Sequence, residues 1–497
     1  MPVIFASSSN AVSNFHAVKA GKLRKLASKI YTDDLRSPPK EIVRRHRLEI
    51  AAHFYPGAVI SHRSALEARV SPGGKFHLTV PGAAAPVRKL PGLEIRLWKG
   101  PGPQPGDVAL PLHEGGELFS SSQERALLEN LQIARPRGKD EPKVLPAEEL
   151  EKWLDRRVRI HGPEWLNDLE RRARELAAAL GWERERAELE QLLGAFRGEP
   201  SNRRLATDIA RSRSRGKPYD PDRITLFSTL HARLAAERFV ELPRSPVEEL
   251  ENRAFWEAYF SNFIEGTKFS VEEARVIVYD QNAARELRRK RPEDAHDVRE
   301  TYRLIVDPNI SAEVPANTGR FIELLKRRHA RMMASRATVE PGVFKKVKNE
   351  VGSRVFVAPD LVVETLVRGW PPGRTLPSAT SRALYVLFLI AEVHPFKDGN
   401  GRISRLGMNA ELEQAGQARL IIPTSFRSDY LSVLEALTLQ HNPEPFVAFG
   451  HKLVDINSRI PFGSFEDSHD YFHKTGALDE PSAAHFDLST FRDTPTQ

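Results

Sequence analysis

The chain of 497 residues has no cysteine. Disulfide bonds, catalytic thiolates and cysteine-based zinc sites are therefore excluded. No apolar run reaches the roughly 20 residues that a membrane-spanning helix needs. Residues 1–20 also lack a basic segment followed by an apolar one, which is the pattern of a secretory signal. These absences predict a soluble cytoplasmic protein without a membrane partner.

What the chain has in excess is positive charge. Its net charge is +8 and its pI is about 9.5, which favours an acidic partner such as nucleic acid. Residues 1–50 contain ten Lys or Arg and four Asp or Glu, so part of the excess lies at the N-terminus. A solvated basic face would explain the same composition. Hydrophobic residues make up 40% of the chain, enough for packed cores in two to four domains.

Residues 393–405 hold the densest group of chemically useful side chains. They read Val-His-Pro-Phe-Lys-Asp-Gly-Asn-Gly-Arg-Ile-Ser-Arg. The preceding residues 383–391 are almost wholly apolar and predict a buried helix, which Pro395 must end near His394. Gly399 and Gly401 permit a tight loop with positive φ, and a second helix is expected to follow.

Each polar residue of this loop suits phosphate chemistry. Successive N–H groups over Gly399–Gly401, at the start of a helix, predict an anion site. Arg402 and Arg405 lie three residues apart and can present guanidinium groups to phosphate oxygens. Asp398 offers a hard oxygen ligand for phosphate-bound Mg²⁺, and His394 is placed to take a proton from an incoming hydroxyl. The alternative is a polar corner between two helices with a surface histidine.

These residues resemble the signature of the Fic family, His-Pro-Phe-x-Asp-Gly-Asn-Gly-Arg-x-x-Arg, and match it at every fixed position. The resemblance implies a nucleotidyltransferase that moves AMP from ATP, its co-substrate, to a Ser, Thr or Tyr hydroxyl of a target protein, which can be the enzyme itself. It assigns six roles: the base, the anchor of the loop, the Mg²⁺ ligand, the α-phosphate ligand together with the loop amides, and the ligands of the β- and γ-phosphates. In that order the residues are His394, Phe396, Asp398, Asn400, Arg402 and Arg405.

A second pattern lies upstream, at the end of a helix predicted over residues 246–266. Ser261, Glu265 and Gly266 match the Fic inhibitory pattern Ser/Thr-x-x-x-Glu-Gly/Asn, and Gly266 is a natural helix C-cap. The Glu265 carboxylate is expected to pair with Arg405, so that ATP binds only in a nonproductive pose. An exposed acid at a helix end is the alternative. In some members of the family the same glutamate supports removal of AMP.

Two further segments resemble supports of a Fic active site. Residues 354–359, Arg-Val-Phe-Val-Ala-Pro, predict the hairpin flap that aligns a target segment by strand addition, with an ordinary loop hairpin as the alternative. Residues 341–345 stand where relatives carry Pro-Gly-x-Tyr/Phe-Arg, but Lys345 replaces the arginine. Tyr430 is expected near a nucleotide base or in the core.

The N-terminal part predicts a separate module. Short helices are followed by two strands, Phe76–Val80 and Leu93–Trp98, as in a winged helix-turn-helix. Residues 30–32, 54–67 and 122–130 resemble the N-terminal domain of AbiEi-type antitoxins. That resemblance implies double-stranded DNA as a partner.

In such a fold, the helix predicted over Ser61–Ala68 enters the major groove, with His62 and Arg63 as the candidate DNA contacts. A module that makes only protein contacts is the alternative.

The predicted fold class is mainly α: an all-helical Fic core with a small β-hairpin flap, preceded by an α+β domain and a helical connector. The expected parts are a winged helix-turn-helix domain (1–115), the connector (116–200), a basic boundary, the Fic domain (219–462) and a flexible tail (463–497). Other readings stay open. They are another nucleotide donor, phosphotransfer as in Doc-like toxins, removal of AMP, a DNA-binding regulator that only senses nucleotide, and a homodimer.

Overall fold

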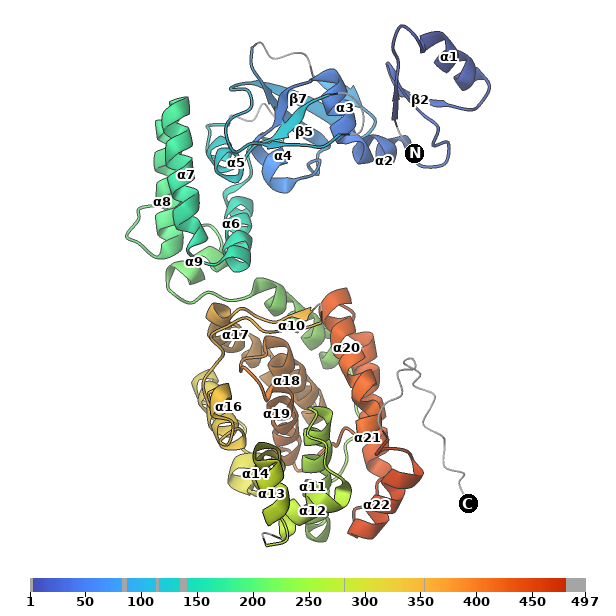
Figure 1. Cartoon of the computed structure of the whole chain (residues 1–497), viewed down its shortest axis with the longest axis vertical. Coiled ribbons are helices and arrows are strands. Elements are labelled where there is room, and N and C mark those ends of the chain that lie inside the picture. Colours follow the sequence, from blue (N-terminus) through green and yellow to red (C-terminus); the bar gives the residue numbers. More distant parts are fainter. Residues whose placement is uncertain are drawn as a thin grey trace. The chain divides into compact units, whose positions relative to one another are not determined.

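The computed structural model describes residues 3–82, 87–112, 116–134, 141–280, 282–352 and 354–479. The chain divides into two compact units, Met1–Gly216 and Lys217–Gln497 (Figure 1). Every helix within the described ranges is too short or too polar to span a bilayer. The predicted class, a helical core with a small hairpin preceded by a mixed α and β region, is confirmed.

The first unit begins with two sheets. A three-stranded sheet has the order β1-β3-β2, and a six-stranded mixed sheet has the order β6-β7-β5-β4-β9-β8. One face of the larger sheet packs its apolar side chains against α2 and α3. The elements are β1 (Val3–Phe5), α1 (Ala11–Lys19), β2 (Arg24–Ala27), β3 (Ile30–Thr32), α2 (Pro39–Arg45), α3 (Arg47–Phe54), β4 (Ala58–Ile60), α4 (His62–Glu67), β5 (Lys75–Val80), β6 (Arg88–Leu90), β7 (Leu93–Lys99), β8 (Val108–Ala109) and β9 (Leu118–Ser120).

The prediction of a two-stranded wing is wrong. Strands β5 and β7 lie side by side but run parallel, with His77 opposite Arg96. The antiparallel partner of β7 is β6, which lies inside the stretch expected to be loop. Parallel strands need a crossover between them, and this one contains β6, whose short, polar sequence gave no strand signal.

The rest of the first unit is helical and has its own core. Its helices are α5 (Gln123–Asn130), α6 (Ala147–His161), α7 (Trp165–Leu180), α8 (Glu183–Arg197) and α9 (Asp208–Ser214). Helix α9 lies where the sequence predicted a boundary. Its Ala210 is fully buried in this core, and its Arg213 forms a buried ion pair of 2.8 Å with Asp155 of α6. That long-range contact explains why a basic, serine-rich segment is folded.

The second unit is built around two long helices, α18 and α19 (Figure 1). All residues of α18 except Arg382 are buried, as expected from its apolar sequence. The elements are α10 (Pro221–Ala235), α11 (Val247–Ile264), α12 (Val271–Tyr279), α13 (Arg285–Lys290), α14 (Pro292–Val306), α15 (Pro308–Ser311), α16 (Thr318–Met332), η1 (Ala337–Val339), β10 (Glu350–Val351), β11 (Arg354–Val355), η2 (Pro359–Leu361), α17 (Val362–Arg374), α18 (Ala379–Val393), α19 (Asn400–Gln414), η3 (Thr424–Phe426), α20 (Arg427–Gln440), α21 (Glu444–Arg459) and α22 (Phe465–Lys474).

The expected flexible tail is partly folded. Helix α22 lies within it, and its Phe472 is fully buried against Trp256 and Phe260 of α11. The sequence of α22 is mostly polar, so its single buried aromatic face was missed. Residues 480–497 of the predicted tail lie outside the described residues.

Candidate active site

The loop between α18 and α19 has the backbone that its glycines and proline predict. Helix α18 ends at His394, which has a left-handed φ of 51°, and Gly399 precedes α19 with a φ of 77°. Asn400 is 1% exposed; its carboxamide accepts a hydrogen bond from the Phe396 N–H (2.8 Å) and donates one to the Phe396 carbonyl (2.9 Å). Asn400 therefore braces the loop, and its expected contact with a phosphate stays a prediction.

The His394 imidazole is held between the loop and the hairpin formed by β10 and β11. It stacks on Phe356 with ring centroids 3.8 Å apart, and its Nδ1 lies 3.3 Å from the Ala391 carbonyl. Because a carbonyl can only accept, Nδ1 carries the proton and Nε2 is left as a base. Burial, with a smaller contribution from Lys345, lowers the pKa of His394 to about 4, so the ring is neutral at pH 7.

A bracket made by His329, Gly342, Lys345 and Asn349 holds the loop from behind. The His329 Nε2–H donates to the Asp398 carbonyl (3.0 Å), while its Nδ1 accepts from the Gly342 N–H (2.9 Å). The Lys345 N–H donates to the Pro395 carbonyl (2.9 Å). The Asn349 amide donates to the Phe396 carbonyl (3.1 Å). Several loop carbonyls are thus fixed, which positions the base.

Lys345 stands where an arginine was expected, and its side chain also takes part in this bracket. It is 4% exposed, and its Nζ donates to Asn349 Oδ1 (2.6 Å). Burial, aided by the charge of Arg223, lowers the pKa of Lys345 to about 7. Lysine at this position therefore keeps a buried hydrogen-bond donor beside the loop.

The carboxylate of Glu265, at the end of α11, lies against the arginine that the sequence paired with it. Glu265 Oε1 is 2.8 Å from Arg405 Nη2. Arg405 also donates to the Ser261 hydroxyl (3.0 Å) and carbonyl (2.8 Å). A Cβ on Gly401 would overlap the Glu265 carboxylate, so only glycine leaves room for this contact. Gly266 follows with a φ of 92°.

The Arg402 side chain lies against α14 and α11. It is 3% exposed, and its Nη1 lies 2.6 Å from Asp297 Oδ2 of α14 and 3.3 Å from Asn262 Oδ1 of α11. Arg402 is therefore paired within the protein in this structure, and its expected contact with a phosphate stays a prediction. Asp297 is 105 residues from Arg402 in the sequence, and no local pattern predicts that the two residues pair.

A cavity of about 530 Å³ opens over the loop. His394, Gly401, Arg405 and Glu265 line it together with Arg354 of the hairpin and Arg427 of α20. Tyr430, Leu431 and Leu434 supply an apolar wall, so Tyr430, although 2% exposed, contributes to both core and cavity. Three arginines beside an apolar wall suit a phosphorylated ligand with a flat ring. Arg354 and Arg427 were missed because no local pattern marks them.

A short hairpin is present, but it is formed by β10 and β11, so only Arg354 and Val355 of the predicted 354–359 flap belong to it. Strands β10 and β11 pair antiparallel, with Val351 opposite Arg354. Val351 and Val355 are 67% and 51% exposed. A short hairpin with exposed apolar side chains beside a cavity can offer its edge to another chain.

Asp398 is exposed at the loop, and its Oδ1 accepts a hydrogen bond from the Gly399 N–H (2.7 Å). No cluster of three or more His, Asp or Glu side chains in the described ranges could hold a metal. A single carboxylate fits Mg²⁺ that arrives with phosphate, because this ion keeps several waters and takes few protein ligands.

The two candidate DNA contacts are not available to a groove. His62 and Arg63 are 3% and 6% exposed. The His62 ring lies between Ser61 and Gln132, while Arg63 pairs with Glu67 and Glu141 at 2.9 Å each. A short helix that packs on the polar face of a sheet, rather than standing free, explains the difference.

Part of the second unit is similar to a known protein family. Residues 322–412 match the model of the Fic/DOC family. The Caenorhabditis elegans protein adenylyltransferase fic-1 is 28% identical over 152 residues, which are 30% of this chain and 30% of that protein. Protein adenylyltransferase Fic of Drosophila persimilis is 34% identical over 126 residues, 24% of each chain. The chain thus spans less than a third of the length of these curated relatives.

Solved structures are also similar in part. One is a Fic domain containing signaling protein from Bacteroides thetaiotaomicron, with 18% identity and a TM-score of 0.36 over 50% of this chain and 97% of that chain. Another is Fic-1 (aa134 - 508) from C. elegans, with 17% identity and a TM-score of 0.33 over 66% of this chain and 98% of that chain.

Proposed function

We propose that the second unit is a protein adenylyltransferase that moves AMP from ATP to a hydroxyl of a target protein. The observation that carries this proposal is the lining of one cavity by a neutral histidine, a glycine-rich helix N-terminus and Arg405. Relatives of 28% and 34% identity are named protein adenylyltransferases, which supports the same activity.

In the proposed reaction, His394 Nε2 removes the proton of the target hydroxyl as its oxygen attacks the α-phosphorus of ATP. A new P–O bond forms, the bond from the α-phosphorus to the bridging oxygen breaks, and pyrophosphate leaves. The amides at the start of α19 face the transferred phosphate, and Arg405 holds the outer phosphates. Asp398 would hold Mg²⁺, which neutralises phosphate charge when it is bound.

The activity is inhibited by Glu265 in this proposal. Arg405 is already bonded to Glu265 and Ser261, so it is not free for a γ-phosphate. Release requires only that the Glu265 side chain, 27% exposed, leaves the guanidinium. The same glutamate, facing the cavity, could instead direct a water at a bound AMP-protein, which keeps AMP removal as the alternative reaction.

Intact-mass spectrometry of the full chain tests this proposal. Wild type and Glu265→Gly are incubated with Mg²⁺ and each of ATP, GTP, CTP and UTP. With ATP, we expect the variant to gain one AMP. We expect at least roughly tenfold less on the wild type, because Glu265 occupies Arg405 there; tenfold corresponds to about 1.4 kcal/mol. Glu435→Gln, at the same cavity, is a control that removes a carboxylate without freeing Arg405. Absence of an adduct on Glu265→Gly with every nucleotide would contradict the proposal.

Nucleic acid is a second proposed partner, for the first unit. Residues 1–216 contain 37 Lys or Arg and 27 Asp or Glu, whereas residues 217–497 contain 37 and 39. The whole positive excess thus lies in the first unit. Since α4 is buried, the contact surface is assigned to exposed lysines of residues 19–40, among them Lys22, Lys25 and Lys29.

Duplex binding measured over a series of salt concentrations tests this assignment. Reversing Lys22, Lys25 and Lys29 to glutamate should weaken binding and reduce the slope of log K against log salt by roughly three. Reversal of three exposed cations of the second unit, Lys290, Arg320 and Lys474, is the control with the same net charge. Equal weakening by both sets would refute the surface.

A further inference from the structure

A fully buried glutamate lies two residues before His394. Glu392, in the last turn of α18, is 0% exposed. Its Oε1 is 2.7 Å from Arg223 Nε of α10. Its Oε2 pairs with Arg354 of β11 and accepts a hydrogen bond from the Thr438 hydroxyl (2.7 Å). Four separate elements of the second unit therefore meet at one carboxylate.

Two of these partners fix the hairpin. Arg354 is itself a hairpin residue, and Arg223 Nη2 donates to the carbonyl of the next one, Val355 (2.8 Å). The residue after that, Phe356, stacks on the His394 ring. A buried carboxylate thus links the backbone and side chains of β11 to the helix that carries the base.

We propose that Glu392 is a positioning residue, which holds the β10–β11 hairpin at the distance from His394 that a target hydroxyl requires. The proposal rests on the proposed transfer of AMP to a protein. It assigns Glu392 to the placement of the hairpin, because its partners come from the hairpin, α10 and α20, and none from the loop between α18 and α19.

Charge makes this junction specific. A carboxylate that neutralises two guanidinium groups in a buried place tolerates few alternative arrangements, because any shift leaves a buried charge unpaired. The hairpin has only two residues in each strand, too few to hold its own position. The position of the hairpin is therefore imposed by Glu392 and Arg223.

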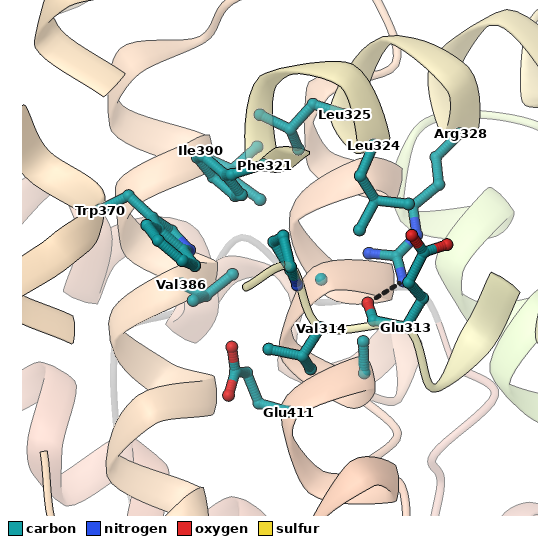
Figure 2. Close-up of a pocket in the computed structure, with 13 residues that line it drawn as sticks. Glu313, Val314, Phe321, Leu324, Leu325, Arg328, Trp370, Val386, Ile390 and Glu411 are labelled. Atoms are coloured by element: carbon teal, nitrogen blue, oxygen red, sulfur yellow. Dashed lines mark hydrogen bonds between the residues drawn. The ribbon is translucent and has the colours of Figure 1, made fainter. Parts of the chain in front are cut away.

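The change Glu392→Gln removes the charge and nearly preserves the shape. The matched control is Glu411→Gln. Glu411 is also a buried glutamate, 3% exposed, with two arginine partners, Arg374 (2.5 Å) and Arg382 (3.5 Å). Glu411 lies on α19 and does not contact the hairpin through these partners. Figure 2 shows it beside a pocket lined by Trp370 and Val386 among others. The volume of this pocket is about 10 Å³.

Hydrogen–deuterium exchange of the full chain is the first measurement, because it needs no activity. Glu392→Gln should increase exchange in peptides covering the β10–β11 hairpin at least tenfold over wild type, with α18 and α19 unchanged. Glu411→Gln should leave the hairpin as in wild type. Unchanged hairpin exchange in Glu392→Gln, or equal loosening by both variants, would overturn the proposal.

Binding and transfer are then compared in the Glu265→Gly background. We expect Glu392→Gln to keep the Kd for ATP within twofold and to lower AMP transfer to protein at least tenfold. A comparable loss of ATP binding would make the residue merely structural. If Glu265→Gly itself transfers nothing, the proposed function fails, while the exchange data still decide the role of Glu392.

Arg223→Lys guards against misfolding of the glutamate variant. Arg223 is partly exposed (18%), so its replacement is milder. Lysine keeps the charge but cannot reach both Glu392 and the Val355 carbonyl. This variant should loosen the hairpin by at least threefold, and exchange equal to wild type would count against the proposal.

Discussion

Two glutamates of the second unit each bind an arginine that lines the cavity, yet their surroundings differ. Glu265 ends a helix, is followed by a glycine with positive φ, and keeps 27% of its side chain exposed. Glu392 lies inside a helix and has no exposed surface. An ion pair in contact with water exchanges partners at little cost, whereas a buried one cannot lose a partner cheaply. The first contact suits a switch and the second suits a fixed support.

The largest effect is expected from the proposed base, His394, which lines the same cavity as Arg405 and Arg354. His394→Ala should lower AMP transfer in the Glu265→Gly background by about 10²–10⁴-fold, the usual contribution of a general base. ATP binding should persist, because neither glutamate nor Arg405 is altered. Single-turnover transfer and calorimetric binding measure the two quantities. A variant that keeps full transfer would show that His394 is not the base.

Stability separates the two glutamates directly. Glu392→Ala should lower the free energy of unfolding by about 3–5 kcal/mol, because Arg223 and Arg354 lose a buried partner. Glu265→Ala should lower it by only about 1–2 kcal/mol, because the buried Arg405 keeps the Ser261 hydroxyl and carbonyl as hydrogen-bond partners. Urea unfolding followed by circular dichroism gives both values. Equal losses would show that exposure does not distinguish the two pairs.

The smallest effect concerns the cation beside the base. Lys345→Met removes a charge that lowers the pKa of His394, so that pKa should rise from about 4 by less than about one unit, because burial is the larger cause. NMR titration of the ring measures it.

The pH dependence of this group has a definite sign. The neutral ring is favoured in the folded chain, so its contribution to stability is complete above the unfolded value of about 6.5 and is lost as the pH falls towards 4. Lys345→Met should move the acidic limit of activity upward by the same small amount. An unchanged pKa would mean that Lys345 supports only the loop.

Local contacts account for what the sequence could predict. The end of α18 at His394 and the glycine conformation before α19 follow from short patterns whose residues have one suitable arrangement. The pairing of Glu265 with Arg405, 140 residues away, was expected only from the resemblance to the Fic family. Other contacts between distant segments could not be predicted. Asp297 reaches Arg402 from α14, Arg223 reaches Glu392 from α10, and Arg213 folds an apparent boundary onto α6.

The same limit explains the errors in the first unit. A strand sequence shows which faces are apolar but not the direction of its neighbour, so β5 and β7 looked like a hairpin. His62 and Arg63 looked exposed because polar residues usually are, and only the packing of α4 against α5 and β5 buries them. The positive charge of this unit was visible from composition, whereas its location on the surface was not.

The packing of α11, the helix that ends at Glu265, limits how the chain can be truncated. Helix α11 is covered on one side by the aromatic face of α22, where Trp256 meets Phe465 and Phe472. It is held on another by Arg419, which pairs with Glu257 at 2.6 Å. A fragment that stops before residue 465 would bare this helix and lose the inhibitory contact together with part of the core. Loss of inhibition by deletion is therefore coupled to loss of folding, and a point change at Glu265 is the route that separates them.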